Sequence, residues 1–220
     1  PEQQSVVIQG VYRSNYVILG IPIVSNIYRG DSIGTITMLV AIVVPLFNLL
    51  AVFLFEKFNG KNKHNPRKML RSIAKNPLIL ATILGLLYTL FGVSFPVCVD
   101  TVLNDLGAVT IPIALLILGA DLDFYFGRVK VRLLLATVFG KIFLVPLLFL
   151  PPAIVLGFRG QALASLLAMY ASPAAVSGYI MAQNENADHH LAGQIVVITS
   201  VLSCFTLFLF IALLKEWQLI

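Results

Sequence analysis

The chain has 220 residues, of which 59% are hydrophobic and 11% are charged, and its mean hydropathy is +0.93. This composition lies far outside the range of soluble domains and excludes a soluble globular protein. A formal net charge of +5 would suggest nucleic acid in a soluble domain, but in a membrane protein the positions of the basic residues matter more, and no nucleic-acid partner is expected.

The apolar residues fall into seven blocks, each of about 17–25 residues, the length that an α-helix needs to cross the hydrocarbon layer. Such blocks predict an all-α polytopic membrane protein with seven transmembrane helices. A membrane barrel would instead show alternating segments of about ten residues. In chain order the predicted spans are 6–28, 33–55, 77–97, 106–122, 133–157, 161–182 and 190–214.

A basic loop after the second span sets the expected orientation. Residues 57–75 contain seven Lys and Arg, and by the positive-inside rule such a short loop stays in the cytoplasm. Alternation from this loop also places the breaks at Lys130 and after Gln183 in the cytoplasm. The parts expected to face out are the C-terminus and the turns at Arg29, Asp100 and Arg159. The predicted location is the cytoplasmic (plasma) membrane, which the chain would cross several times with its outer helices in contact with lipid.

The first and sixth spans have a similar pattern. Each has a proline in its interior, Pro22 and Pro173, followed by a short polar turn and an unbroken apolar helix that ends in a Phe/Leu cluster. The two prolines lie five spans apart, an odd number, so the two helix pairs should cross the membrane in opposite directions. This pattern predicts an inverted-topology repeat.

Proline removes a backbone donor and clashes with the preceding turn, so Gly20–Pro22 and Ser172–Pro173 are each expected to kink or interrupt a span. Unpaired backbone groups persist in hydrocarbon only beside protein or a water-filled cavity. Half-helix N-termini in such a cavity suit carboxylates, and freed carbonyls suit cations. The two breaks therefore predict a transport site, whereas a single proline could be no more than a packing kink.

The predicted substrate-binding residues are Asn15, Gly20, Pro22, Lys141, Ser172, Pro173 and Ser177. The prolines with Gly20 and Ser172 would expose backbone groups, Asn15 and Ser177 would donate hydrogen bonds, and Lys141 would neutralise the anion. Two interpretations of Lys141 stay open, because a helix starting at Arg132 puts it about 13 Å into the bilayer, whereas a span starting at Ile142 makes it a cytoplasmic flank. Arg13 is expected to snorkel to the cytoplasmic interface.

Other polar residues are expected to be structural. Asp121 and Asp123 resemble an interfacial helix terminus more than an ion site. Asp188 should cap the helix that begins with His189 and His190. Adjacent histidines point apart on a helix and have no third ligand at a suitable spacing, so no metal is expected.

Functions of other classes fit the sequence less well. An intramembrane enzyme would need acid and base groups from separate spans within hydrogen-bond reach, and none is visible, so neither enzymatic activity nor a cofactor is expected. A retinal-type protein would need a lysine in the middle of its last span, whereas Lys215 is at the end. A channel or a seven-helix receptor without transport coupling stays open as the alternative. Cys98 and Cys204 are expected to be inert core residues.

Six motifs in order resemble the auxin efflux carrier family of membrane transporters, whose members include plant PIN-type carriers and many prokaryotic relatives. They are "RSNYVILGIPIV", "NPLILATILGLL", "LGAVTIPIALLILGADL", "FGKIFLVPLL", "ASPAAVSGYIMAQ" and "LAGQIVVITSVLSCFTL". Each motif is weak alone, but together they cover nearly the whole chain. The short basic loop is similar to that of compact prokaryotic members.

The resemblance implies a fold of two inverted five-helix repeats (5+5), similar to bile-acid sodium symporters, in which the fourth and ninth helices are broken and cross near the midplane. The first and sixth spans of this chain look like those two helices. The implied organisation is residues 1–56 as the end of the first repeat, 57–75 as the cytoplasmic loop and 76–220 as the second repeat.

The resemblance also implies a secondary active transporter of a small carboxylate or auxin-like anion. The family has about three helices before the first one seen here, so the chain is expected to be the C-terminal part of a longer carrier. The direction of transport, coupling to H⁺ or Na⁺ and a homodimer stay open.

Overall fold

A computed structural model of the chain describes residues 2–28, 34–58, 77–92, 95–120 and 130–220, together with single positions between 67 and 75. Asp121, Asp123 and most of the basic loop lie outside the described residues. The chain is mostly helical, and the described residues contain no strand beyond one isolated bridge. The prediction of an all-α fold is confirmed for this part of the chain.

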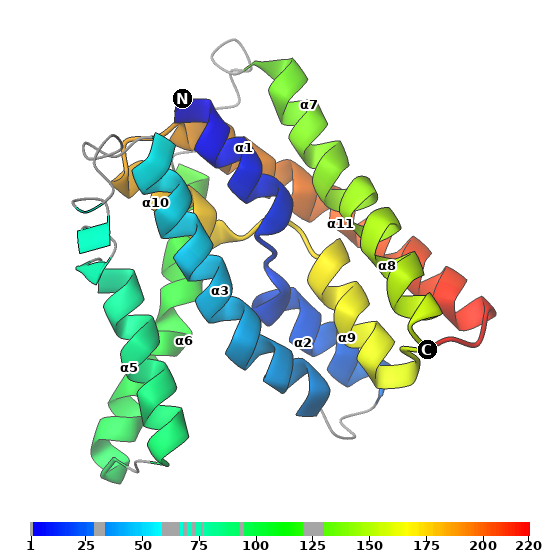
Figure 1. Cartoon of the computed structure of the whole chain (residues 1–220), viewed down its shortest axis with the longest axis horizontal. Coiled ribbons are helices and arrows are strands. Elements are labelled where there is room, and N and C mark those ends of the chain that lie inside the picture. Colours follow the sequence, from blue (N-terminus) through cyan, green and yellow to red (C-terminus); the bar gives the residue numbers. More distant parts are fainter. Residues whose placement is uncertain are drawn as a thin grey trace.

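The helices lie at the predicted apolar blocks, and each block contains one helix or several in succession (Figure 1). They are α1 (Glu2–Tyr12), α2 (Tyr16–Ile27), α3 (Gly34–Phe58), α5 (Pro77–Phe91), α6 (Val97–Ala120), α7 (Val131–Phe139), the π-helical η2 (Gly140–Leu144), α8 (Val145–Val155), α9 (Gly160–Ala171), α10 (Val176–Asn184) and α11 (His189–Glu216).

Among the described residues, three helical stretches are long and apolar enough to cross a membrane. They are α3, α11 and the continuous stretch Val131–Val155 formed by α7, η2 and α8. Shorter apolar helices are α2, α9 and the Ile79–Tyr88 part of α5. Both α2 and α9 are short because each is one half of an interrupted helix, with α1 and α10 as the other halves.

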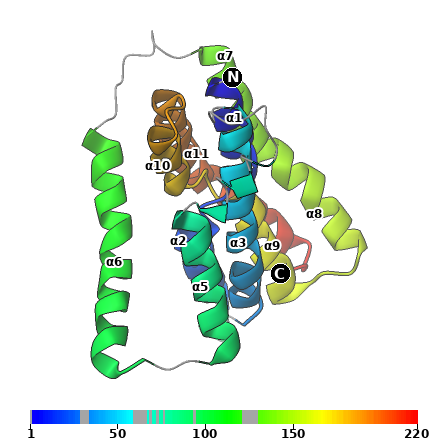
Figure 2. The same ribbon diagram turned by 60° about the vertical axis from the view of Figure 1, so that its left-hand side comes forward.

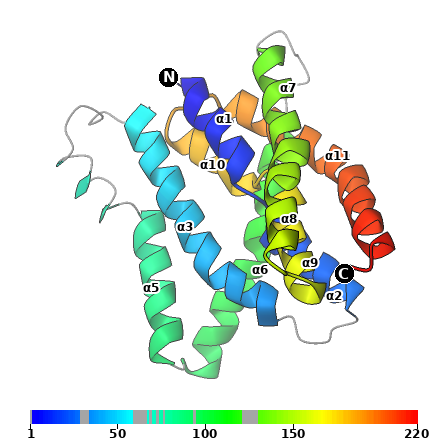
Figure 3. The same cartoon turned by 45° about the vertical axis from the view of Figure 1, so that its right-hand side comes forward.

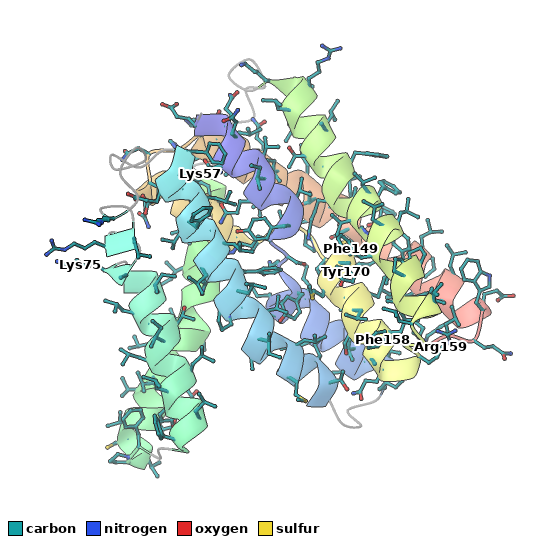
Figure 4. All side chains as sticks on the ribbon, viewed as in Figure 1. Lys57, Lys75, Phe149, Phe158, Arg159 and Tyr170 are labelled. Carbon is teal, nitrogen blue, oxygen red and sulfur yellow. The ribbon has the colours of Figure 1, made fainter. Side chains whose placement is uncertain are left out.

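The core consists of clusters of buried apolar side chains around the interrupted helices. One cluster joins α1, α7, η2, α10 and α11, a second joins α2, α3 and α9, and a third joins α8, α9 and α11. At the edge of the third, the exposed ring of Phe149 stacks on Tyr170 with centroids 5.1 Å apart (Figure 4). The first two clusters therefore combine helices from both halves of the chain, and the third joins helices of the second half.

The outer faces of the helices are apolar and exposed. The helix α6 packs against α10 and stands at the edge of the molecule, and its described side chains are exposed (Figure 2). Cys98 on α6 and Cys204 on α11 are exposed as well, so the prediction that they are core residues was wrong. An apolar block that crosses lipid has apolar side chains on all faces, and the sequence alone does not tell which face is inside.

Hydrogen bonds near the helix ends show which ends lie together. Gln3 Nε2 donates to Asp188 Oδ2 over 2.9 Å, so α1 and α11 begin side by side. At the opposite end, the Gly160 N–H donates to the Leu219 carbonyl over 2.8 Å, which places the C-terminus beside the start of α9. Figure 4 shows Lys57 at the first of these ends and Arg159 at the second.

The prediction that Pro22 interrupts the first span was wrong. Pro22 lies inside α2, which continues to Ile27, and its side chain is exposed. The interruption comes earlier, at Arg13–Asn15, where the sequence has no proline. A proline withholds one donor and can be accommodated as a kink, whereas extended backbone needs partners for all its polar groups. At Arg13–Asn15 those partners are present, as described below.

Gly20 allows close packing between α2 and α9, which lie side by side (Figure 3). A Cβ atom on Gly20 would lie 3.1 Å from the Cβ atom of Ala168 on α9. Helices in membranes commonly approach each other closely at such small residues. In lipid their association depends on van der Waals contacts, because the hydrophobic effect does not drive helices together there. Gly20 therefore fixes helix spacing and does not form the break.

The packing at Gly20 gives a stability prediction. Gly20→Leu should separate α2 from α9 and lower the free energy of unfolding by about 1–3 kcal/mol through overpacking. Gly107→Leu on α6 is the control, because a Cβ atom there meets nothing within 4 Å. Unfolding by SDS in mixed micelles measures both. Equal stability of the two variants would contradict the close approach.

Candidate functional site: a crossing of two interrupted helices

The two interruptions cross each other and pair through their backbones. The Asn15 N–H donates to the Pro173 carbonyl over 2.8 Å, and the Ala175 N–H donates to the Arg13 carbonyl over 3.3 Å. Ser14 and Ala174 thus form an isolated antiparallel bridge. Figure 1 shows the link between α1 and α2 crossing the link between α9 and α10 at the centre of the molecule. Each break therefore supplies hydrogen-bond partners to the other.

The second interruption follows from its sequence. A residue before proline avoids helical backbone, and Ser172 is extended, with φ −64° and ψ 151°. Its hydroxyl donates back to the Ala168 carbonyl, which satisfies one free carbonyl at the end of α9. The Ala174 N–H donates to Thr199 Oγ1 on α11 over 3.1 Å. The interruption predicted at Ser172–Pro173 is confirmed.

The first interruption depends on contacts from distant parts of the chain. Asn15 occupies the position before the first residue of α2, with φ −84° and ψ 38°, and its side chain makes no capping hydrogen bond. That side chain is half-buried, so its amide is available at the crossing. The Ser14 hydroxyl donates to the Ser172 carbonyl over 3.4 Å. No local sequence signal specifies this break.

Two helix N-termini, those of α2 and α10, begin at the crossing. The first N–H groups of a helix have no partner within it, and the helix dipole adds partial positive charge there. The C-terminal ends of α1 and α9 lie at the same crossing and present carbonyl oxygens. The backbone can therefore attract an anion at two points and a cation at two others.

Arg13 lies inside the protein, and the prediction that it snorkels to the interface was wrong. Its side chain is 6% exposed, and its guanidinium donates from Nη2 to Asn48 Oδ1 over 2.8 Å and from Nη1 to Met181 Sδ over 2.9 Å. Asn48 Nδ2 donates in turn to Thr82 Oγ1 over 3.1 Å. Because α1 ends at Tyr12, Arg13 is in the break and extends toward α3 instead of the interface.

A small hollow adjoins the crossing between α1, α10 and α11. Its lining includes Gln9, Arg13, Ala175, Gly178 and Tyr179. It has about 10 Å³ of room for the centre of a water-sized sphere, so an organic anion would need the helices to move apart.

Lys141 is fully buried, at 0% exposure, which decides between its two sequence interpretations. Its helix begins at Val131, and Lys141 lies in the π-helical turn η2, which packs against α1, α9 and α11. Within the described residues its ammonium nitrogen has no hydrogen-bond partner. Single π-helical turns inside α-helices are frequent at functional sites.

A family model described as membrane transport protein matches residues 1–211. The chain belongs to this family, which is that of auxin efflux carrier-type transporters. The resemblance found in the sequence motifs is thus confirmed. It is a family of transporters and not of enzymes. No curated protein matches the chain.

Within this transporter the predicted site residues do not all meet. The backbones or side chains of Asn15, Ser172 and Pro173 come together at the crossing. Gly20 packs on α9, Pro22 is exposed, and Ser177 is exposed on α10 and does not line the hollow.

Several residues near the crossing were not predicted from the sequence. They are Gln9, Asn48, Thr199 and Met181. Asn48 had a usable signal, because it is a lone amide in the middle of an apolar block, where a polar side chain requires a partner. Gln9 and Met181 had none, because their pairing joins residues 172 positions apart.

Asp188 directly precedes α11, whose first residues are His189 and His190. Asp188 accepts from the Leu191 N–H over 3.0 Å, so the predicted cap is confirmed. The ring centroids of His189 and His190 lie 4.3 Å apart, so the prediction that these two side chains point apart was wrong. In the part of the chain that the structure describes, no group of three or more His, Cys, Asp or Glu could hold a metal ion.

Thr199 provides a test of the crossing. Thr199→Val leaves the buried Ala174 N–H without its acceptor and should lower the free energy of unfolding by about 1–3 kcal/mol. Ser200→Ala is the control, because that hydroxyl donates within its own helix, to Val196. SDS titration of both variants measures the difference. A loss no larger than that of the control would contradict the role of Thr199.

Proposed function

We propose that this chain is part of a secondary active transporter that moves a small organic anion, a carboxylate or an auxin-like acid, across the cytoplasmic membrane. Transport would proceed by alternating access at the crossing of the two interrupted helices. The observation that carries the proposal is the pairing of the breaks Arg13–Asn15 and Ser172–Ala175, with the buried guanidinium of Arg13 in the first break. Membership of a transporter family supports it.

The preference for an anionic substrate is argued from Arg13. Its guanidinium keeps its charge when buried, and among the described residues it is not bonded to a carboxylate. A buried charge without a counter-charge is strongly disfavoured in a low-dielectric interior. An anion bound at the crossing would supply that counter-charge, and a neutral or cationic substrate would not.

The roles proposed for individual residues follow their positions. The half-buried amide of Asn15 would donate to the substrate, and Lys141 would neutralise its charge from η2. Ser172 and Pro173 would keep the second break open so that the N-terminus of α10 can attract the anion. Gly20, Pro22 and Ser177 have no direct role in this scheme, because they lie away from the hollow.

The wider architecture is also proposed. Seven spans would belong to two inverted repeats, divided as residues 1–56, the loop 57–75 and residues 76–220. The cytoplasmic side would be the end of the molecule with Lys57 and the start of α7, and the C-terminus would lie outside. The opposed crossing of two interrupted helices, each followed by a long apolar helix, supports this arrangement.

The function can be tested by transport. Purified protein in liposomes should accumulate labelled succinate or labelled indole-3-acetate, two carboxylates of different size. Asn15→Ala should lower uptake by about 10-fold or more, because a hydrogen bond to a charged group contributes about 1.5–3 kcal/mol. Asn104→Ala is the matched control, since Asn104 is exposed on α6 and bonds only to Asp100 on the same helix among the described residues.

Two outcomes would contradict the proposal. In the first, the wild-type protein takes up neither carboxylate at any pH or sodium gradient, and the proposed transport function is refuted. Alternatively, uptake by the Asn15→Ala and Asn104→Ala variants could be equal, which would remove Asn15 from the site. Equal insertion of the variants into liposomes, checked by quantitative immunoblot, is required for the comparison.

A further inference from the structure

Two buried donors beside the crossing converge on one sulfur atom. Arg13 Nη1 lies 2.9 Å from Met181 Sδ on α10, and Gln9 Nε2 lies 3.7 Å from the same sulfur. Gln9 lies in the last turn of α1, and Arg13, the first residue after this helix, donates its N–H to the Gln9 carbonyl over 2.9 Å, so the two residues are adjacent. Gln9 is 3% exposed, and both residues line the hollow described above.

A thioether is a poor partner for these donors. Methionine sulfur is a weak acceptor, whereas a guanidinium has five N–H groups and keeps its charge at any physiological pH. Among the described residues, the bonding partners of the Arg13 guanidinium are the neutral Asn48 oxygen and the Met181 sulfur. Two strong donors are thus held in a buried place where a strong acceptor is missing.

The donors are held in position by the surrounding helices. Asn48 Nδ2 donates to Thr82 Oγ1, which turns the Asn48 oxygen toward Arg13. The amide of Gln9 lies against Gly178 on α10, where an added Cβ atom would be 3.5 Å from Gln9 Cδ. The amide of Gln9 therefore packs directly on α10. Donors fixed in advance in this way lose little entropy when an acceptor binds.

We propose that Arg13 and Gln9 form a carboxylate-binding pair and that Met181 fills their site until the carboxylate of the substrate displaces its sulfur. This inference rests on the proposed anion transport and names the atoms that receive the anion. A carboxylate can accept two hydrogen bonds from the guanidinium and a third from the amide. The side chain of Met181 is half-buried and unbranched, so it can leave the site by rotation about its own bonds.

Displacement of the Met181 side chain by a ligand would also change the contacts of α10 with other helices. Met181 packs on the small cluster of Val52 on α3 and Ile79 on α5, as well as on the central cluster that includes α11. Movement of its side chain would therefore loosen one contact between α10 and the α3–α5 pair. The site would select for a carboxylate over an alcohol of the same length, because only the carboxylate brings a negative charge to the Arg13 guanidinium when it displaces the sulfur.

A tethered carboxylate tests the pair without a ligand. Met181→Glu should place a carboxylate beside Arg13 and raise the thermal unfolding midpoint by about 2–4 °C or more, because a buried guanidinium gains a counter-ion. Met169→Glu is the control, since Met169 is half-buried on α9 in an apolar cluster, and this variant should unfold at a lower temperature. The gain should disappear in the double variant Arg13→Gln, Met181→Glu.

The outcome that overturns the proposal is a Met181→Glu protein as unstable as Met169→Glu. In that case Arg13 and Met181 form a permanent structural contact. The same conclusion follows if the gain persists when Arg13 is replaced by Gln.

The sulfur itself can be observed. The chain has four methionines, so ¹³C-methyl labelling gives few signals, and the Met181 signal is the one lost in Met181→Leu. Titration with succinate should shift this signal in a saturable way, whereas 1,4-butanediol, with the same number of carbons and no charge, should not. The shift should be absent in Arg13→Gln. An unmoved Met181 signal in protein that transports succinate would overturn the proposal.

The two proposals fail in different ways. Stabilisation by Met181→Glu together with absent uptake would leave the carboxylate pair and remove the transport function. Uptake that depends on Asn15, together with an unmoved Met181 signal, would leave the transport function and remove the pair.

Discussion

The structure depends on one constraint, which is that backbone polar groups removed from water must be paired. A helix satisfies its own groups, and an interruption in lipid exposes them. Here two interruptions meet, and the Asn15–Pro173 and Arg13–Ala175 hydrogen bonds pair each break with the other. Neither break is stable alone, so the crossing ties residues almost 160 positions apart and determines how α1, α2, α9 and α10 pack. The core clusters on either side follow from that arrangement.

The second consequence of the crossing concerns charge. Four helix ends meet there, and Arg13 adds a buried guanidinium in the first break. Among the described residues its side-chain partners are an amide oxygen and a thioether sulfur, so a bound anion would supply the counter-charge that this guanidinium lacks. The chain from Arg13 through Asn48 to Thr82 connects this centre to α3 and α5. A ligand bound to Arg13 would therefore also act on α5, which this chain of hydrogen bonds links to the crossing through Asn48 on α3.

The sequence predicts most of the helices and about half of the site. Long apolar blocks locate the helices, and Pro173 locates one break, because both effects are local. The other break escaped prediction because Pro22 is the local signal, whereas the decisive partners of Ser14 and Asn15 are in a distant segment. The burial of Lys141 could be determined only from the structure. The same sequence is compatible with a span that begins before Lys141 and with one that begins after it. The sequence predicted Arg13 at the membrane interface. In the structure α1 ends at Tyr12, and the side chain of Arg13 extends into the protein.

Cross-linking of the two breaks tests the crossing most directly. Opposed residues of an antiparallel pair lie within disulfide range, so Ser14→Cys with Ala174→Cys, in a protein whose Cys98 and Cys204 are replaced by Ser, should form a disulfide under mild oxidation in native membranes. Peptide mass spectrometry detects the link. If the two breaks cross, cross-linking of this pair should be nearly complete, and the pair Pro22→Cys with Ala174→Cys should form little disulfide. Failure of the first pair to cross-link, or equal yields for the two, would contradict the crossing.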